Sequence, residues 1–551
     1  MAGAEGAGFD PGLGPEGNGP YRLLRAGRER LIRRYLAALE DPRGAQEQRL
    51  AAVLSATRAS RFGEAHGLAR VRTLDDLRRA VPVRTHEELR PWLDRVSSGE
   101  DGVLTTDPVR QLLETSGTTG RPKHLPVTDA WAASIAEAQS LWVLAMVRDH
   151  EAAARGRALT VVSPAAHSRS PGGLPIGSNT GRMHLAQPWY VRARYPVPYR
   201  VFCMTPAPLR QYALLRFALE AKVTSLTTAN PSTVLLLARR LHEWREELSA
   251  DLADGTLRRG PAAALSWRER APLELRLRKR PVPTDWRPAA LWPLAVVNCW
   301  KGGPAAYFCE RLPEALGADI PVREVGITAS EGYFAVPLGQ DWGGGALWTI
   351  GHVLEFIGED GQPRWAWELE VGERVRLVIS TEAGLLRYDL QDTLEVIGRA
   401  KNTPVVRFVG KSGRYLNATG EKVTEAQVSE AMRRLARSLG VRPDGFTARL
   451  CWGEVPAIEL AVEGEGLPMP SALASAFDQA LREVNVEYDD KRGSDRLGLP
   501  RVQALAAGSY AAWRARRVEE GAPEGQVKDP LIAMDEAEWA RVVQALPGAR
   551  R

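Results

Sequence analysis

The sequence predicts an α/β fold in two domains, on two observations. The chain has 551 residues, and a single hydrophobic core stops growing at roughly 250–300 residues. Strand-like apolar runs alternate with helical periodicity up to Gly332, as in layered α/β domains, and the pattern becomes rich in strands from Leu347. We therefore expect a large layered α/β domain with a β-rich part over residues 21–410. A small α+β domain is expected over residues 411–551.

The first hundred residues are predicted to be mainly helical. Residues 1–20 are glycine-rich and lack both a charged start and an apolar stretch, so we expect a disordered tail and no signal peptide. Apolar residues at helical spacing predict amphipathic helices over residues 21–39 and 46–56. The glycines of residues 61–67 predict a turn. Short capped helices are then expected at residues 73–79 and 85–92.

The middle of the chain is predicted to alternate strands and helices. Residues 103–113 form an expected strand that leads into a loop, and a long helix is expected from Trp131. Residues 170–177 form a second loop, rich in glycine and proline. Strand-like stretches are expected at residues 158–162, 223–228, 294–299 and 321–328, and helical periodicity predicts helices at residues 209–220 and 231–248.

The last third of the chain begins with strands and ends with an α-β-β-α-β order. Strands are expected at residues 347–357, 368–369, 374–380, 394–397 and 405–409. Beyond the predicted boundary at Gly410, the helices are residues 424–439 and 472–484, and the strands are residues 446–451, 457–462 and 501–506.

The composition indicates a soluble globular protein, with 44% hydrophobic and 25% charged residues. The net charge of +6 is modest, and arginines are spread along the chain rather than gathered in a basic stripe, so no nucleic-acid partner is expected. No window of about 18 uninterrupted apolar residues predicts a membrane span. The four scattered cysteines predict neither a disulfide framework nor a zinc site, and free thiols indicate a reducing cytoplasm.

The stretch from Leu113 to Lys123 contains three threonines, a serine, two glycines and a lysine. Glycines allow close backbone approach, hydroxyls donate hydrogen bonds, and lysine adds positive charge, so the stretch suits a phosphate-binding loop. It is not a Walker A loop, which requires G-x-x-x-x-G-K-[ST] running into a helix. A polar surface turn is an equally good interpretation of this stretch by itself.

Three further motifs follow this stretch in order: residues 328–332 (TASEG), 386–392 (LRYDLQD) and 525–528 (GQVK). The ordered set resembles the adenylate-forming superfamily, which includes acyl-CoA synthetases, luciferases and peptide-synthetase adenylation domains. The sequence is more closely similar to one branch, the Gretchen Hagen acyl-acid amido synthetases, an auxin-responsive family in plants. This closer resemblance is carried by residues 61–63 with 66–67, 99–100, 103–105, 116–128, 330–332, Asn417 with 420–422, and Trp513 with Gly525, Gln526 and Lys528. The resemblance runs from about Gln46 to Leu531, and it implies an adenylate-forming domain followed by a mobile lid domain.

The resemblance implies an ATP-dependent ligase that also needs Mg²⁺. It would activate a carboxylic acid as acyl-AMP with release of pyrophosphate, and then transfer the acyl group to an amine, expected to be that of an amino acid. A monomer is expected, acting on small molecules. Two alternatives remain open: transfer to the thiol of CoA or of a separate carrier protein, and a nucleotide-binding homologue without turnover.

The resemblance also implies roles for individual residues. Three are expected to be catalytic: Lys123 beside the phosphates, Lys528 reaching the α-phosphate, and Glu331 holding Mg²⁺, a hard ion that prefers oxygen ligands. By themselves, Glu331 could be a surface turn residue and Lys528 an exposed lysine. Asp392 is expected to accept the ribose hydroxyls, with a β-turn aspartate as the alternative. The other expected nucleotide contacts are Ser116, Gly117, Thr118, Thr119, Gly120, Ser330 and Lys411.

Two positions depart from the family pattern. Ile327 stands where an aromatic residue usually stacks on adenine, and Tyr333 or Phe334 could compensate. Lys411 stands where an arginine is frequent; lysine keeps the charge but loses the bidentate fork.

The acyl pocket is expected from residues 171–183 and the helix that begins near Pro206. Its candidate contacts are Gly173, Arg182, Met183 and Trp300. Arg182 could equally bind a substrate carboxylate or cap a turn, and Trp300 could instead pack in the core.

Overall fold

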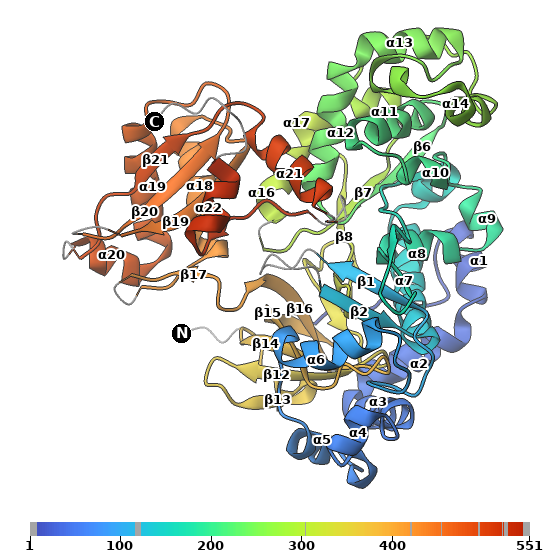
Figure 1. Ribbon diagram of the computed structural model, residues 1–551, viewed down its shortest axis with the longest axis vertical. Coiled ribbons are helices and arrows are strands. Elements are labelled where there is room, and N and C mark those ends of the chain that lie inside the picture. The colour runs from blue at the N-terminus through green and yellow to red at the C-terminus, as the bar shows by residue number, and fades with distance from the viewer. Residues whose placement is uncertain are drawn as a thin grey trace. The chain divides into compact units, whose positions relative to one another are not determined.

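The computed structural model describes residues 8–115, 123–303, 305–418, 421–452, 455–493, 496–520, 522 and 527–543. The chain divides into two compact units, Met1–Phe408 and Val409–Arg551. The first contains three sheets with helices around them, and the second is a smaller α+β unit, drawn in orange and red in Figure 1. This architecture confirms the predicted α/β fold class. Because the arrangement of the two units is not determined, each is described by itself.

An eight-stranded sheet forms the centre of the first unit. Its strand order is β13-β12-β14-β15-β16-β11-β10-β9, and the pairs β12/β14 and β14/β15 are antiparallel. The alternating apolar residues of these strands pack into the main core. The strands are β9 (Ile327–Ala329), β10 (Gly332–Val336), β11 (Gly345–Leu347), β12 (Val353–Gly358), β13 (Pro363–Trp365), β14 (Arg374–Ser380), β15 (Tyr388–Ala400) and β16 (Thr403–Lys411).

A four-stranded sheet, in the order β2-β1-β5-β4, brings distant segments to one edge. Its strands are β1 (Gln111–Thr115), β2 (Lys123–Val127), β4 (Ser168–Arg169) and β5 (Pro175–Gly177). β1 and β2 are antiparallel, with Glu114 opposite His124. β5 runs parallel to β1, with Leu113 beside Gly177, and β4 runs antiparallel to β5. The end of β1, the start of β2, the end of β5 and the start of β4 therefore lie at the same edge.

The third sheet is parallel and carries the peripheral helices of the first unit. Its order is β3-β6-β7-β8, with β3 (Arg157–Thr160), β6 (Val223–Thr227), β7 (Val296–Cys299) and β8 (Val322–Glu324). The second core cluster packs between this sheet and its helices. The helices are α8 (Asn179–Ala186), α9 (Trp189–Arg192), α10 (Tyr199–Phe202), α11 (Ala207–Ala218), α12 (Pro231–Glu243), α13 (Arg245–Asp254), α14 (Trp267–Glu274), α15 (Pro288–Leu291), α16 (Ala305–Cys309) and α17 (Leu312–Leu316).

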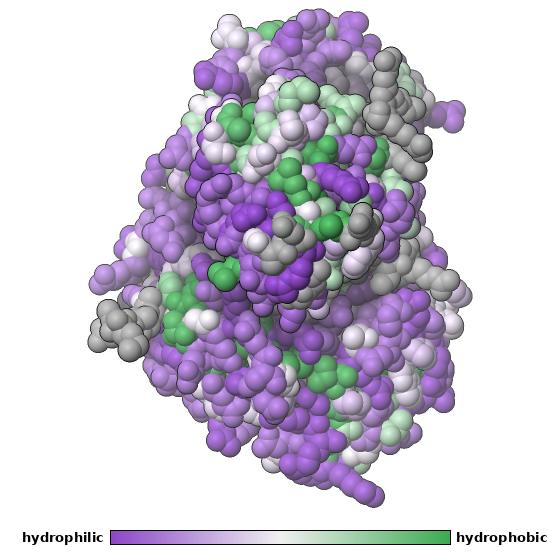
Figure 2. Space-filling model, turned by 90° about the vertical axis from the view of Figure 1, so that its left-hand side faces the viewer, coloured by the Kyte–Doolittle hydropathy of each residue, from purple (hydrophilic) through white to green (hydrophobic). Residues whose placement is uncertain are grey.

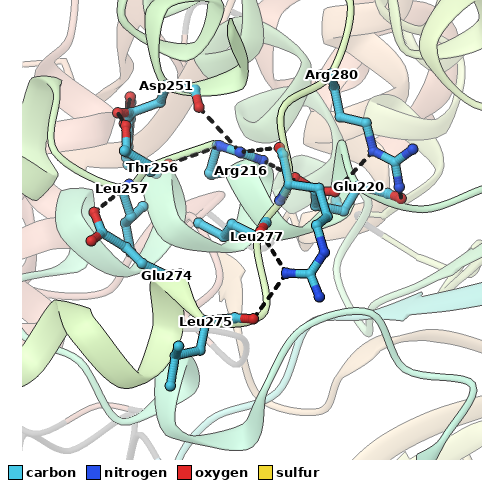
Figure 3. Close-up of polar contacts among 12 residues, drawn as sticks. Arg216, Glu220, Asp251, Thr256, Leu257, Glu274, Leu275, Leu277 and Arg280 are labelled. Atoms are coloured by element: carbon cyan, nitrogen blue, oxygen red, sulfur yellow. Dashed lines mark hydrogen bonds and ion pairs between the residues drawn. The ribbon is translucent and has the colours of Figure 1, made fainter. Parts of the chain in front are cut away.

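A buried arginine ties these peripheral helices together. Arg216 on α11 is fully buried, and its guanidinium donates to the carbonyls of Thr256 and Asp251 at 3.1 Å each. It also pairs with Glu220 at 2.7 Å, and Glu220 pairs with Arg280 at 3.0 Å (Figure 3). The charge is thus compensated and hydrogen-bonded, as a buried guanidinium requires.

Helix α7 (Asp129–Asp149) packs against β10 in the main core. It is the one described helix that is long and apolar enough to cross a membrane by length and composition, and more than half of it is buried inside the unit. Its indole groups also make specific contacts, since Trp142 Nε1 donates to the carbonyl of Glu324 at 2.9 Å. These features are those of a core helix. The face of the molecule in Figure 2 is largely hydrophilic, with apolar residues in small groups.

The N-terminal segment differs from the predicted disordered tail. Among the described residues 8–20, Phe9 packs on Trp342 with ring centroids 5.1 Å apart, and Leu13 is buried in the main core. The single helix predicted over residues 21–39 is broken at Gly27, because two helices meet there. The helices of this part are α1 (Gly19–Ala26), α2 (Glu29–Glu40), α3 (Pro42–Thr57), α4 (Arg61–Ala65), α5 (Leu74–Ala80) and α6 (His86–Ser97), with the 3-10 helix η1 (Leu68–Arg70).

Several other predictions are wrong in detail. The turn predicted at residues 61–67 is largely the helix α4, capped by the Ser60 hydroxyl. Of the strand predicted at residues 103–113, only β1 forms, since Thr105 and Thr106 instead bond the carbonyl of Ala56. The helix predicted at residues 231–248 is divided at Trp244. Three further 3-10 helices are η2 (Glu151–Arg155), η3 (Gly260–Ala264) and η4 (Ala366–Glu368), the last where a strand was predicted.

The second unit contains a four-stranded sheet, in the order β21-β20-β19-β22, covered by helices. α18 and α19 pack on each other, and α19 packs on β21. The elements are β17 (Tyr415–Leu416), β18 (Val423–Thr424), α18 (Glu425–Leu439), β19 (Gly445–Cys451), β20 (Ala457–Glu463), α19 (Pro470–Val484), α20 (Val486–Gly493), β21 (Arg501–Ala504), α21 (Ser509–Glu519), β22 (Ile532–Ala533) and α22 (Glu536–Val543). The predicted α-β-β-α-β order is present, followed by two helices and a strand that the sequence patterns did not indicate.

A buried ion pair holds the start of β15. Arg387 Nε and Nη2 donate to the two carboxylate oxygens of Glu355 on β12, each at 2.8 Å. Arg78 Nε donates to the same carboxylate at 2.9 Å. Arg387 also donates to the carbonyl of Val81 and has a φ of 45°, in the left-handed region. Because Glu355 is only 3% exposed, the charges are shielded from water and depend on one another.

We expect Glu355→Gln to lower the free energy of unfolding of the first unit by about 3–5 kcal/mol, because it leaves buried guanidinium groups without a countercharge. Urea denaturation followed by tryptophan fluorescence measures the change. The matched control is Glu359→Gln, an exposed glutamate just beyond β12, which should change stability by less than about 0.5 kcal/mol. Equal stability of both variants would show that the ion pair does not anchor β15.

Candidate functional site

Glu331 lies in a two-residue turn, with Ser330, between β9 and β10. Two hydrogen bonds fix it: Trp131 Nε1 on α7 donates to the Glu331 carbonyl at 2.8 Å, and the Tyr388 hydroxyl donates to Glu331 Oε1 at 3.1 Å. A side chain at Gly332 would place its Cβ 2.6 Å from His352 Nε2, so the turn needs glycine there. The carboxylate is thus held by its backbone and by one oxygen, and it is only partly buried.

The Tyr388 hydroxyl lies near three carboxylates. Burial raises its pKa, and the charges of Glu331, Asp392 and Asp389 raise it further, so it remains protonated and donates to Glu331. Asp392 is on β15 and is buried. Asp389 pairs with Arg376 at 3.4 Å and accepts from the Gln391 amide, so it serves the turn. The structure therefore brings Glu331 and Asp392 together, although they are about sixty positions apart in the sequence.

The described residues contain no group of three or more metal-ligating side chains arranged to hold a metal ion. This is compatible with Mg²⁺, which is usually held by one or two carboxylates together with substrate phosphates and water. Glu331, oriented by Tyr388, offers such a carboxylate.

Lys123 begins β2, opposite Thr115. Burial lowers the pKa of His86 on α6 to about 4, and the positive charge of Lys123 contributes to this shift, so His86 is neutral beside the lysine. The remaining predicted phosphate-loop residues, Ser116, Gly117, Thr118, Thr119 and Gly120, lie outside the described residues.

Neither Tyr333 nor Phe334 has a ring face exposed for stacking on adenine in the described structure. Ile327 begins β9 and is buried. Tyr333 and Phe334 are both buried in the main core, and the Tyr333 hydroxyl donates to the carbonyl of Val325 at 2.6 Å. Neither ring therefore compensates for Ile327.

The predicted acyl-pocket residues lie on different elements of the first unit. Arg182 on α8 lies with its guanidinium 5.3 Å from the ring centroid of Trp131, and it donates to Asn179 Oδ1 at 2.9 Å. It therefore stands beside the indole that holds the Glu331 turn. Met183 packs against the main core. Gly173 lies in the exposed loop before β5, with a φ of 83°. Trp300 follows β7, and its amide donates to the carbonyl of Ala229.

Surface cavities occur elsewhere in the described part of the chain. One, of about 320 Å³, is lined by His184, Trp189 and Tyr195 among others, and a more polar one, of about 570 Å³, lies beside Glu359 and Arg364. None of the predicted site residues lines either cavity.

In the second unit, Lys528 is exposed between two buried neighbours, Val527 and Asp529. Asp529 pairs with Arg514 on α21 at 2.8 Å, and the Thr447 hydroxyl donates to the carbonyl of Pro530 at 2.6 Å. The chain that directly follows Lys528 is therefore anchored, while Lys528 itself is exposed. Gly525 and Gln526 of the predicted motif lie outside the described residues.

Lys411 ends β16 and is exposed. Burial raises the pKa of Glu425 on α18, and the positive charges of Arg414, Lys528 and Lys411 oppose this rise. Both predicted lysines thus lie close enough to act on the same carboxylate.

Trp131 and Tyr388 are parts of the site that the sequence motifs do not predict. Tyr388 lies inside the LRYDLQD motif, which was the available signal for it. Trp131 begins a helix and has the pattern of a core residue, so nothing in the sequence marks its contact with Glu331.

Solved structures with this fold define its class. A GH3.15 acyl acid amido synthetase in complex with 2,4-DB matches with a TM-score of 0.80 at 18% identity, covering 97% of each chain. A 2-hydroxyisobutyryl-CoA ligase in the postadenylation state matches with a TM-score of 0.52 at 15% identity, covering 91% of this chain and 90% of the other. The chain shares the fold of these two enzymes.

The chain belongs to the GH3 family. It matches the family's N-terminal domain over residues 31–322, its central domain over residues 347–411 and its C-terminal domain over residues 426–537. A probable indole-3-acetic acid-amido synthetase from Oryza sativa subsp. japonica is 25% identical, covering 88% of this chain and 87% of the relative. A jasmonoyl–L-amino acid synthetase from Nicotiana attenuata is 22% identical, covering 75% and 76%. These matches confirm the family resemblance read from the motifs.

Glu324, at the end of β8, provides a test of the framework beside this site. Its carboxylate is buried, accepts from the amides of Lys301 and Gly326, and has a pKa raised to about 7, chiefly by burial. Because the folded state holds the proton more tightly, stability should fall as pH rises from the ordinary pKa of 4.5 to about 7.

We expect Glu324→Gln to remove that part of the pH dependence, which is about 3 kcal/mol in the free energy of unfolding. Thermal and urea unfolding of both proteins between pH 5 and about pH 8 measures it. Glu16→Gln, at an exposed glutamate, is the control and should follow the wild-type curve. Parallel curves for wild type and Glu324→Gln would contradict the buried, raised carboxyl group.

Proposed function

We propose that this chain is an AMP-forming acyl-acid amido synthetase. The observation that carries the proposal is the Glu331 turn, held by Trp131 and Tyr388 beside Asp392, in a chain that matches all three GH3 domains in order. In the first step an oxygen of the carboxylic acid attacks the α-phosphorus of ATP, and pyrophosphate leaves. In the second step an amine attacks the acyl carbon, the bond to the phosphate oxygen breaks, and AMP leaves.

The residues of the first unit fit a nucleotide and its metal ion. Lys123 and the hydroxyl-rich residues 116–122 would bind the β- and γ-phosphates, and Asp392 would accept the ribose hydroxyls. Glu331 would hold Mg²⁺, which when bound neutralises charge on the departing phosphates. Tyr388 orients that carboxylate by donating to one of its oxygens, so the other oxygen can face the ion.

The second unit would act as a lid that delivers Lys528. An exposed lysine on an anchored backbone can neutralise the charge that develops at the α-phosphate, and it acts only when the lid is closed. Lys411 would approach the same nucleotide, supported by the shared influence of both lysines on Glu425.

The substrate would be a small carboxylic acid, and the acceptor the amine of an amino acid. Relatives are named for indole-3-acetic acid and for jasmonoyl amino acids, which supports these two substrate classes. Arg182, beside Trp131, would bind a carboxylate of the acid or of the amino acid. We further propose that the protein is located in the cytoplasm, which the four free cysteines support. We also propose that it is a monomer without nucleic-acid or membrane partners.

Whether the product is an amide or a thioester depends on whether the acceptor is an amine or a thiol. We expect acid-dependent pyrophosphate release in a screen of indole, jasmonate-like and benzoate-like acids, and an amide product when amino acids are added. Mass spectrometry of products formed with amino acids, CoA or both identifies the acceptor. A thioester with CoA and no amide with any amino acid would show that the chain is an acyl-CoA ligase.

Lys528→Ala should lower the rate of pyrophosphate release by about 10²-fold or more, because charge stabilisation at the reacting phosphate is lost. Binding of ATP, measured by calorimetry, should change little, whereas Asp392→Ala should weaken it. Lys491→Ala, at a lysine on α20 of the same unit, is the control for loss of a positive charge. Undiminished release by Lys528→Ala would remove that lysine from the reaction.

A further inference from the structure

A buried carboxylate with an imidazole on either side lies at the edge of the sheet β2-β1-β5-β4. Glu114, next to last in β1, is 7% exposed. His124 on β2 lies opposite it, with Nε2 at 3.4 Å from Oε2. His167, just before β4, has its Nε2 at 3.5 Å from Oε1. Within the described structure Glu114 Oε1 is buried and has no hydrogen-bond partner, and His167 Nε2 lies just beyond hydrogen-bond distance from it.

The backbone that carries His167 is held by several contacts. The His167 amide donates to the carbonyl of Ile176 at 2.9 Å. Two residues earlier, the Ala165 amide donates to the Tyr199 hydroxyl at 2.6 Å, and its carbonyl accepts from Gln111. A Cβ at Gly177 would lie 2.0 Å from that carbonyl, so strand and loop are in close contact. His167 is thus positioned beside Glu114 by a rigid loop, while a third of its own side chain remains exposed.

This cluster lies between the two halves of the proposed site. β1 leads into residues 116–122, and β2 begins with Lys123, the proposed phosphate contact. On the other side, β5 leads into α8, which carries Arg182 over Trp131. The titratable and charged groups that the sheet brings to this edge are Glu114, Lys123, His124, His167 and Arg169.

We propose that His167, oriented by Glu114, is the general base that prepares the acceptor amine, an inference that rests on the proposed function. Nε2–H faces Glu114 Oε1, which leaves the Nδ1 lone pair as the proton acceptor. Hydrogen bonds of this kind are often long before substrate binds. The buried carboxylate then stabilises the imidazolium that forms.

With an amino acid as acceptor, the amine nitrogen must lose two protons during amide formation. The amine reaches the site as an ammonium ion, because its pKa lies above neutral pH. His167 Nδ1 takes one proton, the freed nitrogen lone pair forms a bond to the acyl carbon, and the acyl carbon–oxygen bond breaks with its electron pair going to AMP. The new amide nitrogen loses its second proton to water, and the imidazolium releases its proton to water.

His167, rather than His124, is assigned this role because of its neighbours. His124 is adjacent to Lys123, on the phosphate side of Glu114. His167 precedes the loop, β5 and α8, from which the acid and amine side of the site is built. A general base for the amine is expected on the side of Glu114 that carries His167, where the acid and the amine are expected to bind.

The test separates the two half-reactions in the full-length protein. The acid that gives the fastest pyrophosphate release in the screen is used, with L-alanine or hydroxylamine as acceptor. We expect His167→Asn to leave the first turnover of pyrophosphate release, measured without acceptor, within about twofold of wild type. The same variant should lower the amide rate with L-alanine at pH 7 by about 10²-fold. Hydroxylamine, which is largely unprotonated at that pH, should restore the rate. The alanine reaction should also recover as pH rises.

Three further variants test the role of Glu114 and the choice of His167 over other histidines. Glu114→Gln should weaken the amide step without abolishing release, and His242→Asn, at an exposed histidine on α12, should change neither step. Equal loss of both steps in His167→Asn, no loss, or a defect that hydroxylamine does not rescue would overturn the assignment, as would an amide-specific defect in His124→Asn alone. Absence of pyrophosphate release from the wild type is a different result, which contradicts the proposed function itself.

Discussion

The buried ion pair between Arg387 and Glu355 is the constraint on which the candidate site depends. It holds a non-glycine residue in the left-handed region immediately before β15. From that position the next residue, Tyr388, extends its hydroxyl to Glu331, and the strand continues to Asp392. The cost of burying the charges is met by the two-point geometry and by the hydrogen bonds of Arg387 to backbone carbonyls. The ion pair therefore contributes to the site by fixing the course of the backbone that carries Tyr388 and Asp392.

The site is built where elements from different parts of the chain meet. α7 supplies the indole that fixes the Glu331 backbone, β15 supplies the hydroxyl that fixes its carboxylate, and α8 places Arg182 over the same indole. The small sheet adds Lys123 on one side and His167 on the other side of Glu114. In this account the first unit holds the substrates and prepares the amine, while the second contributes Lys528 from an anchored but exposed position.

Local patterns predicted the fold class and many elements, and they failed where tertiary contacts decide. Residues 223–228 form strand β6 almost as predicted, because valine and threonine favour strands. Residues 8–20 were expected to be disordered on composition, yet Phe9 and Leu13 pack against residues far along the chain. The apolar residues of residues 21–39 keep helical spacing across Gly27, so this pattern does not show that a helix ends there.

The site was predictable only where motifs carried it. Glu331, Asp392, Lys123 and Lys528 could be named because their motifs occur in the order of a family. Trp131, Glu114 and His167 carry no such signal, since their contacts arise from strand register and helix packing between distant segments. The expected aromatic substitute for Ile327 was wrong for the same reason: Tyr333 and Phe334 alternate into a buried strand, where the core takes both rings.

The proposed reaction requires that the carboxylic acid is activated as an acyl-AMP. The most direct measurement uses an acid labelled with ¹⁸O in its carboxylate, ATP and an amino acid, followed by mass spectrometry of the AMP. We expect AMP to gain one ¹⁸O atom for each amide formed, because the carboxylate oxygen that attacks the α-phosphorus leaves with it. Unlabelled AMP, or label found in inorganic phosphate beside ADP, would contradict it.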